Sequence, residues 1–156
     1  MITNEIISKA VLDIDNWLPN YLNLPYKHLG NDRSGIDCFN LCVLVYKEVL
    51  NIEIPYTTQN SGCDVATNWY DSNLTANILV DRAKPEWGWD IVSEPRSFDI
   101  VLMSIGATSA PNHCALFLDN KILQIMEGRL SWISNYKRYH KQYTVKVGRW
   151  KNDFKI

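Results

Sequence analysis

Two stretches near the N-terminus carry apolar residues at the spacing of a helix. Residues 4–18 form the first, with Asn4 as a candidate N-cap, and Pro19 either ends this helix or begins a short successor. The second stretch begins after Asp37, another good N-cap, and its apolar positions follow at i, i+3, i+4, i+7 and i+11. This stripe consists of Cys38, Leu41, Cys42, Val45 and Val49. Further apolar residues widen the stripe, which predicts a central helix.

The C-terminal half instead shows short β-type segments. They cover residues 98–104, His113–Leu118, 121–126 and 143–149. The dipeptide Asp119-Asn120 separates the two middle segments and is a signal for a tight hairpin. Helices followed by an antiparallel meander predict an α+β domain.

One domain is expected to span residues 1–156, with an insertion at about 57–97. The insertion contains three tryptophans and one predicted helix at about 66–82. A connection of this length is unusual without structure of its own, so we expect it to be ordered and to bear function.

The composition narrows the classes of partner. The net charge is −1, which indicates neither a nucleic acid nor an anionic membrane as partner. The N-terminus has no signal-peptide pattern, and no window approaches the length of an apolar membrane span. We therefore expect synthesis in a cytoplasm, four free cysteine thiols, and delivery by another route for any action outside the cell.

Cys38 is the candidate nucleophile, because a helix N-terminus favours the thiolate that makes cysteine reactive. Cys42 lies one turn deeper, where burial opposes thiolate formation, so the two cysteines are expected to differ in reactivity. Taken alone, Cys38 is also compatible with a packed, inert core residue.

A catalytic cysteine needs a base and a third group that orients the base. His113 opens a predicted strand, and Gln124 lies one hairpin later among apolar residues. We expect Gln124 to accept the Nδ1–H of His113. Each residue alone also has a simpler interpretation: His113 could be a structural histidine, and Gln124 could face the solvent.

A zinc site was the alternative chemistry for the cysteines. Cys38, Cys42 and Cys63, with His113 or Cys114, could supply four ligands, but the sequence has no C-x-x-C pair, and the spacing Cys38–Cys42 lies within one helix. The sequence therefore predicts neither a metal nor another cofactor.

Several motifs resemble those of the NlpC/P60 superfamily of cysteine peptidases, in particular its branch in phage tail proteins. The resemblance runs from about residue 24 to 149 and matches poorly over 57–94. Its motifs are LPYKHLG, SGIDCFNLCVLVYKEVLNIEIP, EPRSFDIVLM, NHCALFLDNKILQ and EGRLS. Phe39 and Asn40 stand where the family commonly has serine and glycine, and an aromatic after the cysteine fits the phage-tail branch.

The resemblance implies a small papain-like fold and specific roles for five residues. Cys38 matches the nucleophile, His113 the base and Gln124 the third residue. Tyr26 matches a tyrosine near the oxyanion, and Asp37 matches an acid that holds the amine of the substrate.

We therefore expect a cysteine endopeptidase that cleaves peptidoglycan stem peptides at a phage tail tip, next to other tail-tip proteins. There are two alternatives. One is a structural tail-tip protein that docks through residues 57–97. The other is an enzyme that uses Cys38 and His113 for a different acyl-transfer reaction. Arg129 could hold a substrate carboxylate or be a surface residue. His140 is expected to be exposed rather than catalytic.

Overall fold

The computed structural model describes residues 3–55, 85, 88–106 and 111–151. The helix predicted at about 66–82 lies outside these residues. The elements are α1 (Asn4–Leu12), α2 (Ile14–Trp17), η1 (Leu18–Tyr21), β1 (Asn31–Asp32), β2 (Gly35–Ile36), α3 (Cys38–Val49), β3 (Trp89–Val92), β4 (Ile100–Met103), β5 (His113–Leu118), β6 (Lys121–Gln124), β7 (Trp132–Asn135), α5 (Tyr136–Tyr139), η3 (Lys141–Tyr143) and β8 (Thr144–Trp150).

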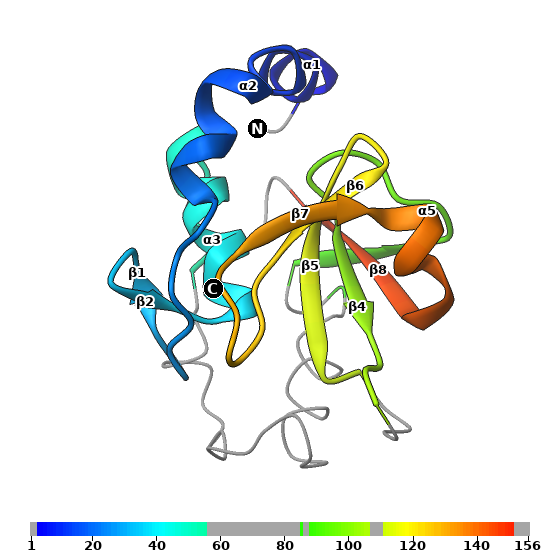
Figure 1. Cartoon of the computed structure of the whole chain (residues 1–156). Helices are drawn as coiled ribbons and strands as arrows, with labels where there is room; N and C mark the ends of the chain where they lie inside the picture. Colours follow the sequence, from blue (N-terminus) through cyan, green and yellow to red (C-terminus); the bar gives the residue numbers. More distant parts are fainter. Residues whose placement is uncertain (1–2, 56–84, 86–87, 107–110, 152–156) are drawn as a thin grey trace.

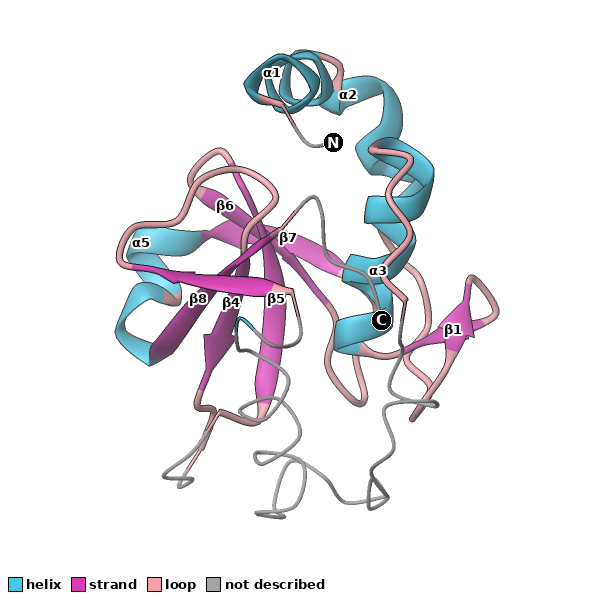
Figure 2. Cartoon of the chain, turned by 180° about the vertical axis from the view of Figure 1, so that it is seen from behind, coloured by secondary structure: helices cyan, strands magenta, loops and turns pink. Residues whose placement is uncertain are grey.

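A six-stranded sheet forms the centre of the fold, with strand order β3-β8-β4-β5-β6-β7. Each neighbouring pair is antiparallel. Helices α1, α2 and α3 gather on one side of this sheet and α5 lies on the other (Figures 1 and 2). The predicted α+β class is therefore confirmed.

The first helix begins at Asn4, and its N-cap lies one residue earlier than predicted. Thr3, not Asn4, is the N-cap, and its hydroxyl accepts a hydrogen bond from the backbone N–H of Ile6 at 3.2 Å. The predicted helix also divides at Asp13 into α1 and α2. Pro19 lies in the short 3-10 helix η1, so the expected short successor is confirmed.

Alternate residues of β5 pack into two separate cores. Cys114, Leu116 and Leu118 belong to the larger core with α3, whereas Ala115 and Phe117 belong to the core on the opposite face. Side chains alternate between the faces of a strand, so His113 shares the face of Ala115 and Phe117. This face also receives α5, through the buried Tyr136.

The hairpin between β5 and β6 confirms its sequence signal. Asp119 has φ of 48° and Asn120 has φ of 66°. Two successive positive φ values are those of a type I′ turn, which matches the twist of the flanking strands. The turn therefore fixes which residues of β6 face those of β5.

Two strands of the sheet were not predicted. β7 lies after the β6 hairpin, and β3 lies inside the range assigned to the insertion. β3 pairs with β8, opposing Trp89 to Trp150, and their rings meet edge to face at 4.9 Å. Residues 89–92 therefore belong to the central sheet.

Within the part of the chain described, no helix has the length and apolar character needed to cross a membrane.

Candidate active site

The start of α3 is fixed by a short network of hydrogen bonds. Asp37 caps the helix by accepting the backbone N–H of Asn40 at 2.7 Å, as predicted. Gly30 accepts from the backbone N–H of Asp37 at 3.0 Å and from the Asn40 side chain at 2.9 Å. A Cβ at Gly30 would lie 2.2 Å from the carbonyl oxygen of Gly35, so only glycine fits there. Cys38 is thereby held as the first residue of the helix.

Tyr26 lies beside the segment that leads into Cys38. Its backbone bridges Ile36, and the flanking bonds are Lys27 N–H to the Ile36 carbonyl at 3.2 Å and Ile36 N–H to the Pro25 carbonyl at 3.0 Å. The structure therefore brings Tyr26 next to the residues before the thiol. Its role near an oxyanion stays a prediction, as does the substrate-binding role of Asp37.

His113 and Gln124 are paired as the hairpin predicted, but through the other ring nitrogen. The Nε2 atom of His113 lies 2.9 Å from Oε1 of Gln124, so the expected bond to Nδ1 was wrong. Nδ1 of His113 is buried and has no hydrogen-bond partner within the described structure. Because Gln124 occupies Nε2, Nδ1 is the nitrogen that remains available for proton exchange with a thiol.

The environment of Cys38 favours its thiolate. Burial disfavours the charged form and alone would raise the pKa of Cys38. The Cys114 thiol, the nearby His113 ring with its positive charge and the backbone N–H of Cys114 outweigh burial. Together they lower the pKa of Cys38 to about 5. This value is well below that of an ordinary cysteine, as a thiol nucleophile requires.

Cys114 lies next to the Cys38 thiol. From the sequence, Cys114 was expected only as a possible metal ligand. Hydrogen bonds to Cys38 and Cys42, together with burial, hold the pKa of Cys114 well above its ordinary value. Cys114 therefore stays protonated and donates towards Cys38. Cys42 is buried, and its thiol donates to the backbone carbonyl of Cys38 at 3.5 Å. Its predicted place in the core is confirmed.

The polar contacts continue beyond Gln124. Its Nε2 atom lies 3.2 Å from the Ser134 hydroxyl and 3.3 Å from Nε2 of His140. The Ser134 hydroxyl lies 2.7 Å from the same His140 nitrogen. His140 is half-buried, so its expected exposure was wrong. No sequence signal identified Ser134, because the strand that carries it was not predicted.

The three predicted catalytic residues are almost inaccessible to water. The exposed fractions are 1% for Cys38, 0% for His113 and 1% for Gln124. Low local dielectric strengthens hydrogen bonds and charge interactions within such a cluster. Substrate can reach this thiol only if the groups covering it move.

Arg129 lies on the turn between β6 and β7. Its side chain is exposed, and the guanidinium stacks over the ring of Trp132 at 3.8 Å. None of the hydrogen bonds or ion pairs found among the described residues joins Arg129 to Cys38 or His113. Its substrate-binding role stays a prediction.

Within the described residues, no three or more His, Cys, Asp or Glu side chains are grouped so as to hold a metal ion. Cys63, one of the ligands considered from the sequence, lies outside those residues.

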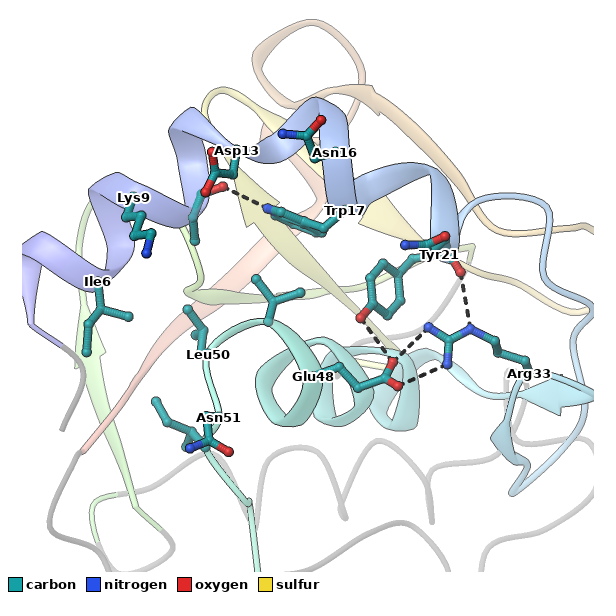
Figure 3. Close-up of a pocket in the computed structure, with 14 residues that line it drawn as sticks. Ile6, Lys9, Asp13, Asn16, Trp17, Tyr21, Arg33, Glu48, Leu50 and Asn51 are labelled. Atoms are coloured by element: carbon teal, nitrogen blue, oxygen red, sulfur yellow. Dashed lines mark hydrogen bonds and ion pairs between the residues drawn. The ribbon is translucent and has the colours of Figure 1, made fainter.

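A separate cleft of about 900 Å³ opens at the other end of α3 (Figure 3). It lies between the N-terminal helices and the last turn of α3, and none of the candidate catalytic residues lines it. Inside it, Glu48 accepts the Tyr21 hydroxyl at 3.0 Å and two guanidinium nitrogens of Arg33 at 2.7 and 3.2 Å.

The fold and the site together define an α+β domain of the papain-like type, with a cysteine at a helix start and a histidine at the start of a sheet strand. Residues 23–149 match the NlpC/P60 family. The chain therefore belongs to the NlpC/P60 family. No curated protein sequence matches the chain.

Solved structures of low sequence identity share this fold. One is the NlpC/p60 domain of the peptidoglycan hydrolase SagA, with 15% identity, a TM-score of 0.52 and coverage of 95% of this chain and 99% of that one. The peptidoglycan hydrolase RipB of Mycobacterium tuberculosis has 15% identity, a TM-score of 0.54 and coverage of 95% and 68%. NlpC2 of Trichomonas vaginalis has 13% identity, a TM-score of 0.59 and coverage of 96% and 49%.

Proposed function

We propose that this protein is a cysteine endopeptidase that cleaves the stem peptides of peptidoglycan. The observation that carries the proposal is the thiol of Cys38, which has a pKa of about 5 beside the pair formed by His113 and Gln124. Membership of the NlpC/P60 family supports the same chemistry. SagA and RipB, two proteins of the same fold, are described as peptidoglycan hydrolases.

The first half of the reaction forms an acyl-enzyme. The Cys38 thiolate attacks the carbonyl carbon of the scissile amide, and the carbonyl oxygen becomes an oxyanion. The backbone N–H of Cys38 at the start of α3, with Tyr26 beside it, is suited to stabilise that charge. Imidazolium His113 then gives a proton from Nδ1 to the leaving amine, and the C–N bond breaks.

The second half releases the product and regenerates the thiolate. Neutral His113 takes a proton from water, and the resulting hydroxide attacks the thioester carbonyl. The C–S bond breaks, which leaves a carboxylic acid, the Cys38 thiolate and the His113 imidazolium. Gln124 accepts the Nε2–H of His113 throughout and so keeps Nδ1 directed at the reacting atoms.

We place this activity on a phage tail, next to other tail-tip proteins and in contact with the cell wall. The support for this placement is the likeness of the sequence around Cys38 to the phage-tail branch, including the aromatic Phe39. Delivery by a tail would bring the domain to peptidoglycan after synthesis in the host cytoplasm.

The decisive experiment measures the release of new amino groups from purified peptidoglycan of several chemotypes. Wild type is expected to release them, and Cys38→Ala is expected to fall to background. Cys42→Ala is the matched control, since it removes a buried thiol of the same helix and should retain activity. Equal activity in wild type and Cys38→Ala would refute the proposal.

The alternative is a structural tail-tip protein that keeps the fold for docking. The observation that favours it is the nearly complete burial of Cys38, His113 and Gln124. An inactive wild type on every chemotype, together with binding to other tail-tip proteins, would favour this alternative.

A further inference from the structure

We propose that Ser134 and His140 are positioning residues that fix the direction of the Gln124 side-chain amide. This inference rests on the proposed function of Cys38 and His113 and extends it by two residues. The network runs from His113 through Gln124 to Ser134 and His140, with successive distances of 2.9, 3.2 and 2.7 Å.

The strands place these side chains on one face of the sheet. Gln124 of β6 opposes Trp132 of β7, and Ile122 opposes Ser134. Gln124 and Ser134 are therefore diagonal neighbours on the face that carries Ile122 and, on β5, His113. His140 follows α5, which packs on the same face. The same face also carries the buried apolar side chains of Val101, Ala115 and Phe117.

A glutamine amide has two orientations of nearly the same shape. One presents Oε1 to His113, and the other presents the NH₂ group. Only the oxygen can accept the Nε2–H of His113, which is present both in the imidazolium and in the neutral tautomer with Nδ1 free to act as base. The turned amide would place N–H groups against Nε2–H and disfavour both states. The reaction therefore depends on the orientation of Gln124.

Ser134 and His140 present acceptors to the far end of this amide. When Nε2 of His140 carries no proton, the Ser134 hydroxyl donates to it, which leaves the lone pairs of the hydroxyl facing the Gln124 NH₂ group. The lone pair of His140 Nε2 also lies 3.3 Å from the same amide nitrogen. Ser134 and His140 thus favour the orientation of the Gln124 amide in which its NH₂ group faces them and its Oε1 atom faces His113.

This arrangement requires a neutral His140. Burial, followed by the charge of His113, lowers the pKa of His140 below its ordinary value. The side chains of Lys137, Arg138 and Lys141 on the neighbouring elements are cationic, but they are exposed to solvent, which screens their charge. Without His140, the Ser134 hydroxyl could turn and donate to a reversed Gln124. His140 therefore fixes the direction of the hydroxyl, and the hydroxyl fixes the amide.

The test combines single and double variants. Ser134→Ala and His140→Leu are each expected to lower kcat about tenfold with little change in KM, because orientation and not substrate binding is lost. His140→Gln, which returns an acceptor near the position of Nε2, should recover most of the rate. In a Gln124→Ala background, Ser134→Ala should have no further effect, since there is no amide left to orient.

A second readout does not depend on hydrolysis. The far-ultraviolet absorbance of the Cys38 thiolate, taken as wild type minus Cys38→Ala, is followed against pH. Ser134→Ala and His140→Leu should move this titration to higher pH while thermal unfolding shows an intact fold. An unchanged titration and unchanged kcat would overturn the inference and leave the proposed function standing. A shifted titration in a protein that hydrolyses no peptidoglycan would retain the inference and refute the proposed function.

Discussion

The two ends of α3 carry polar clusters of opposite character. At its start, Cys38 and the groups around His113 are buried, and little of their surface meets water. At its end, Glu48 binds Arg33 and Tyr21 in a cleft of about 900 Å³ (Figure 3). The side chains of Arg33 and Glu48 are 43% and 38% exposed. The cleft thus lies away from the thiol.

The difference between the ends shows which feature identifies a reactive site. In the cleft the charges of Arg33 and Glu48 neutralise each other, and solvent screens them. At the start of α3, burial opposes the thiolate of Cys38, yet its pKa is low because the Cys114 thiol and the His113 ring stabilise the charged sulfur. A buried Nδ1 on His113 without a partner in the described structure also costs stability. Such a cost is typical of a functional group.

The largest effect is expected from His113→Ala. The variant removes the proposed base and the ring whose positive charge helps to lower the pKa of Cys38. Peptidoglycan hydrolysis should fall by about three orders of magnitude, as for other catalytic bases. The thiolate titration of Cys38 should also move towards that of an ordinary cysteine. The rate of hydrolysis is measured as the initial rate of amine release, and the thiolate titration is measured as absorbance against pH.

The control for His113→Ala comes from the opposite end of α3. Glu48→Ala removes the carboxylate of the cleft and is expected to keep the wild-type rate. If His113→Ala kept the rate and Glu48→Ala lost it, the functional end of the helix would be the other one.

A smaller effect is expected from Cys114→Ala. This change removes a thiol donor to Cys38 but keeps the backbone N–H of residue 114 and the ring of His113. The pKa of Cys38 should rise, so the fraction of thiolate falls most at acid pH. If the pKa rises by about one, activity should be about fivefold lower near pH 5, approach a tenfold loss at lower pH and be close to wild type above pH 7.

The pH–rate profile measures the effect of Cys114→Ala, and Cys114→Ser is its matched control. Serine keeps a donor at this position and should restore part of the activity at acid pH. Superimposable acid limbs for wild type, Cys114→Ala and Cys114→Ser would mean that the side chain of residue 114 does not tune Cys38.

The two ends of α3 also differ in how much the sequence predicted. The N-cap Asp37, the helix-first Cys38 and the hairpin that pairs His113 with Gln124 are local features, so spacing and turn chemistry predicted them. Which nitrogen of His113 meets Gln124 depends on ring rotation, which spacing does not specify. The contact of Cys114 with Cys38 depends on how α3 packs on the sheet.

Long-range pairing explains the remaining errors. β3 finds its partner in β8, far along the chain, so its four residues carry little local signal. β7 is equally short, and missing it concealed Ser134 and the partners of His140. The cleft at Glu48 joins Tyr21 and Arg33 from separate segments, and no spacing rule predicts that meeting.

The smallest effect is expected from Glu48→Gln, which removes the charge of the cleft and keeps its shape. Because Arg33 and Glu48 are both substantially exposed, the free energy of unfolding should fall by less than about 1 kcal/mol. Burial, the hydrogen bond to Glu48 and the charge of Glu48 raise the pKa of Tyr21 to about 12. Without that charge the pKa of Tyr21 should decrease, and burial should keep it above the ordinary value.

Ultraviolet titration of tyrosinate measures this change, with Tyr21→Phe identifying the contribution of Tyr21 among the eight tyrosines. Peptidoglycan hydrolysis by Glu48→Gln should equal that of wild type, because the cleft and the thiol lie at opposite ends of α3. A loss of hydrolysis of more than about tenfold with an unchanged free energy of unfolding would contradict the comparison. In that case the cleft would take part in binding the wall, and the charge of Glu48 would be part of the recognition.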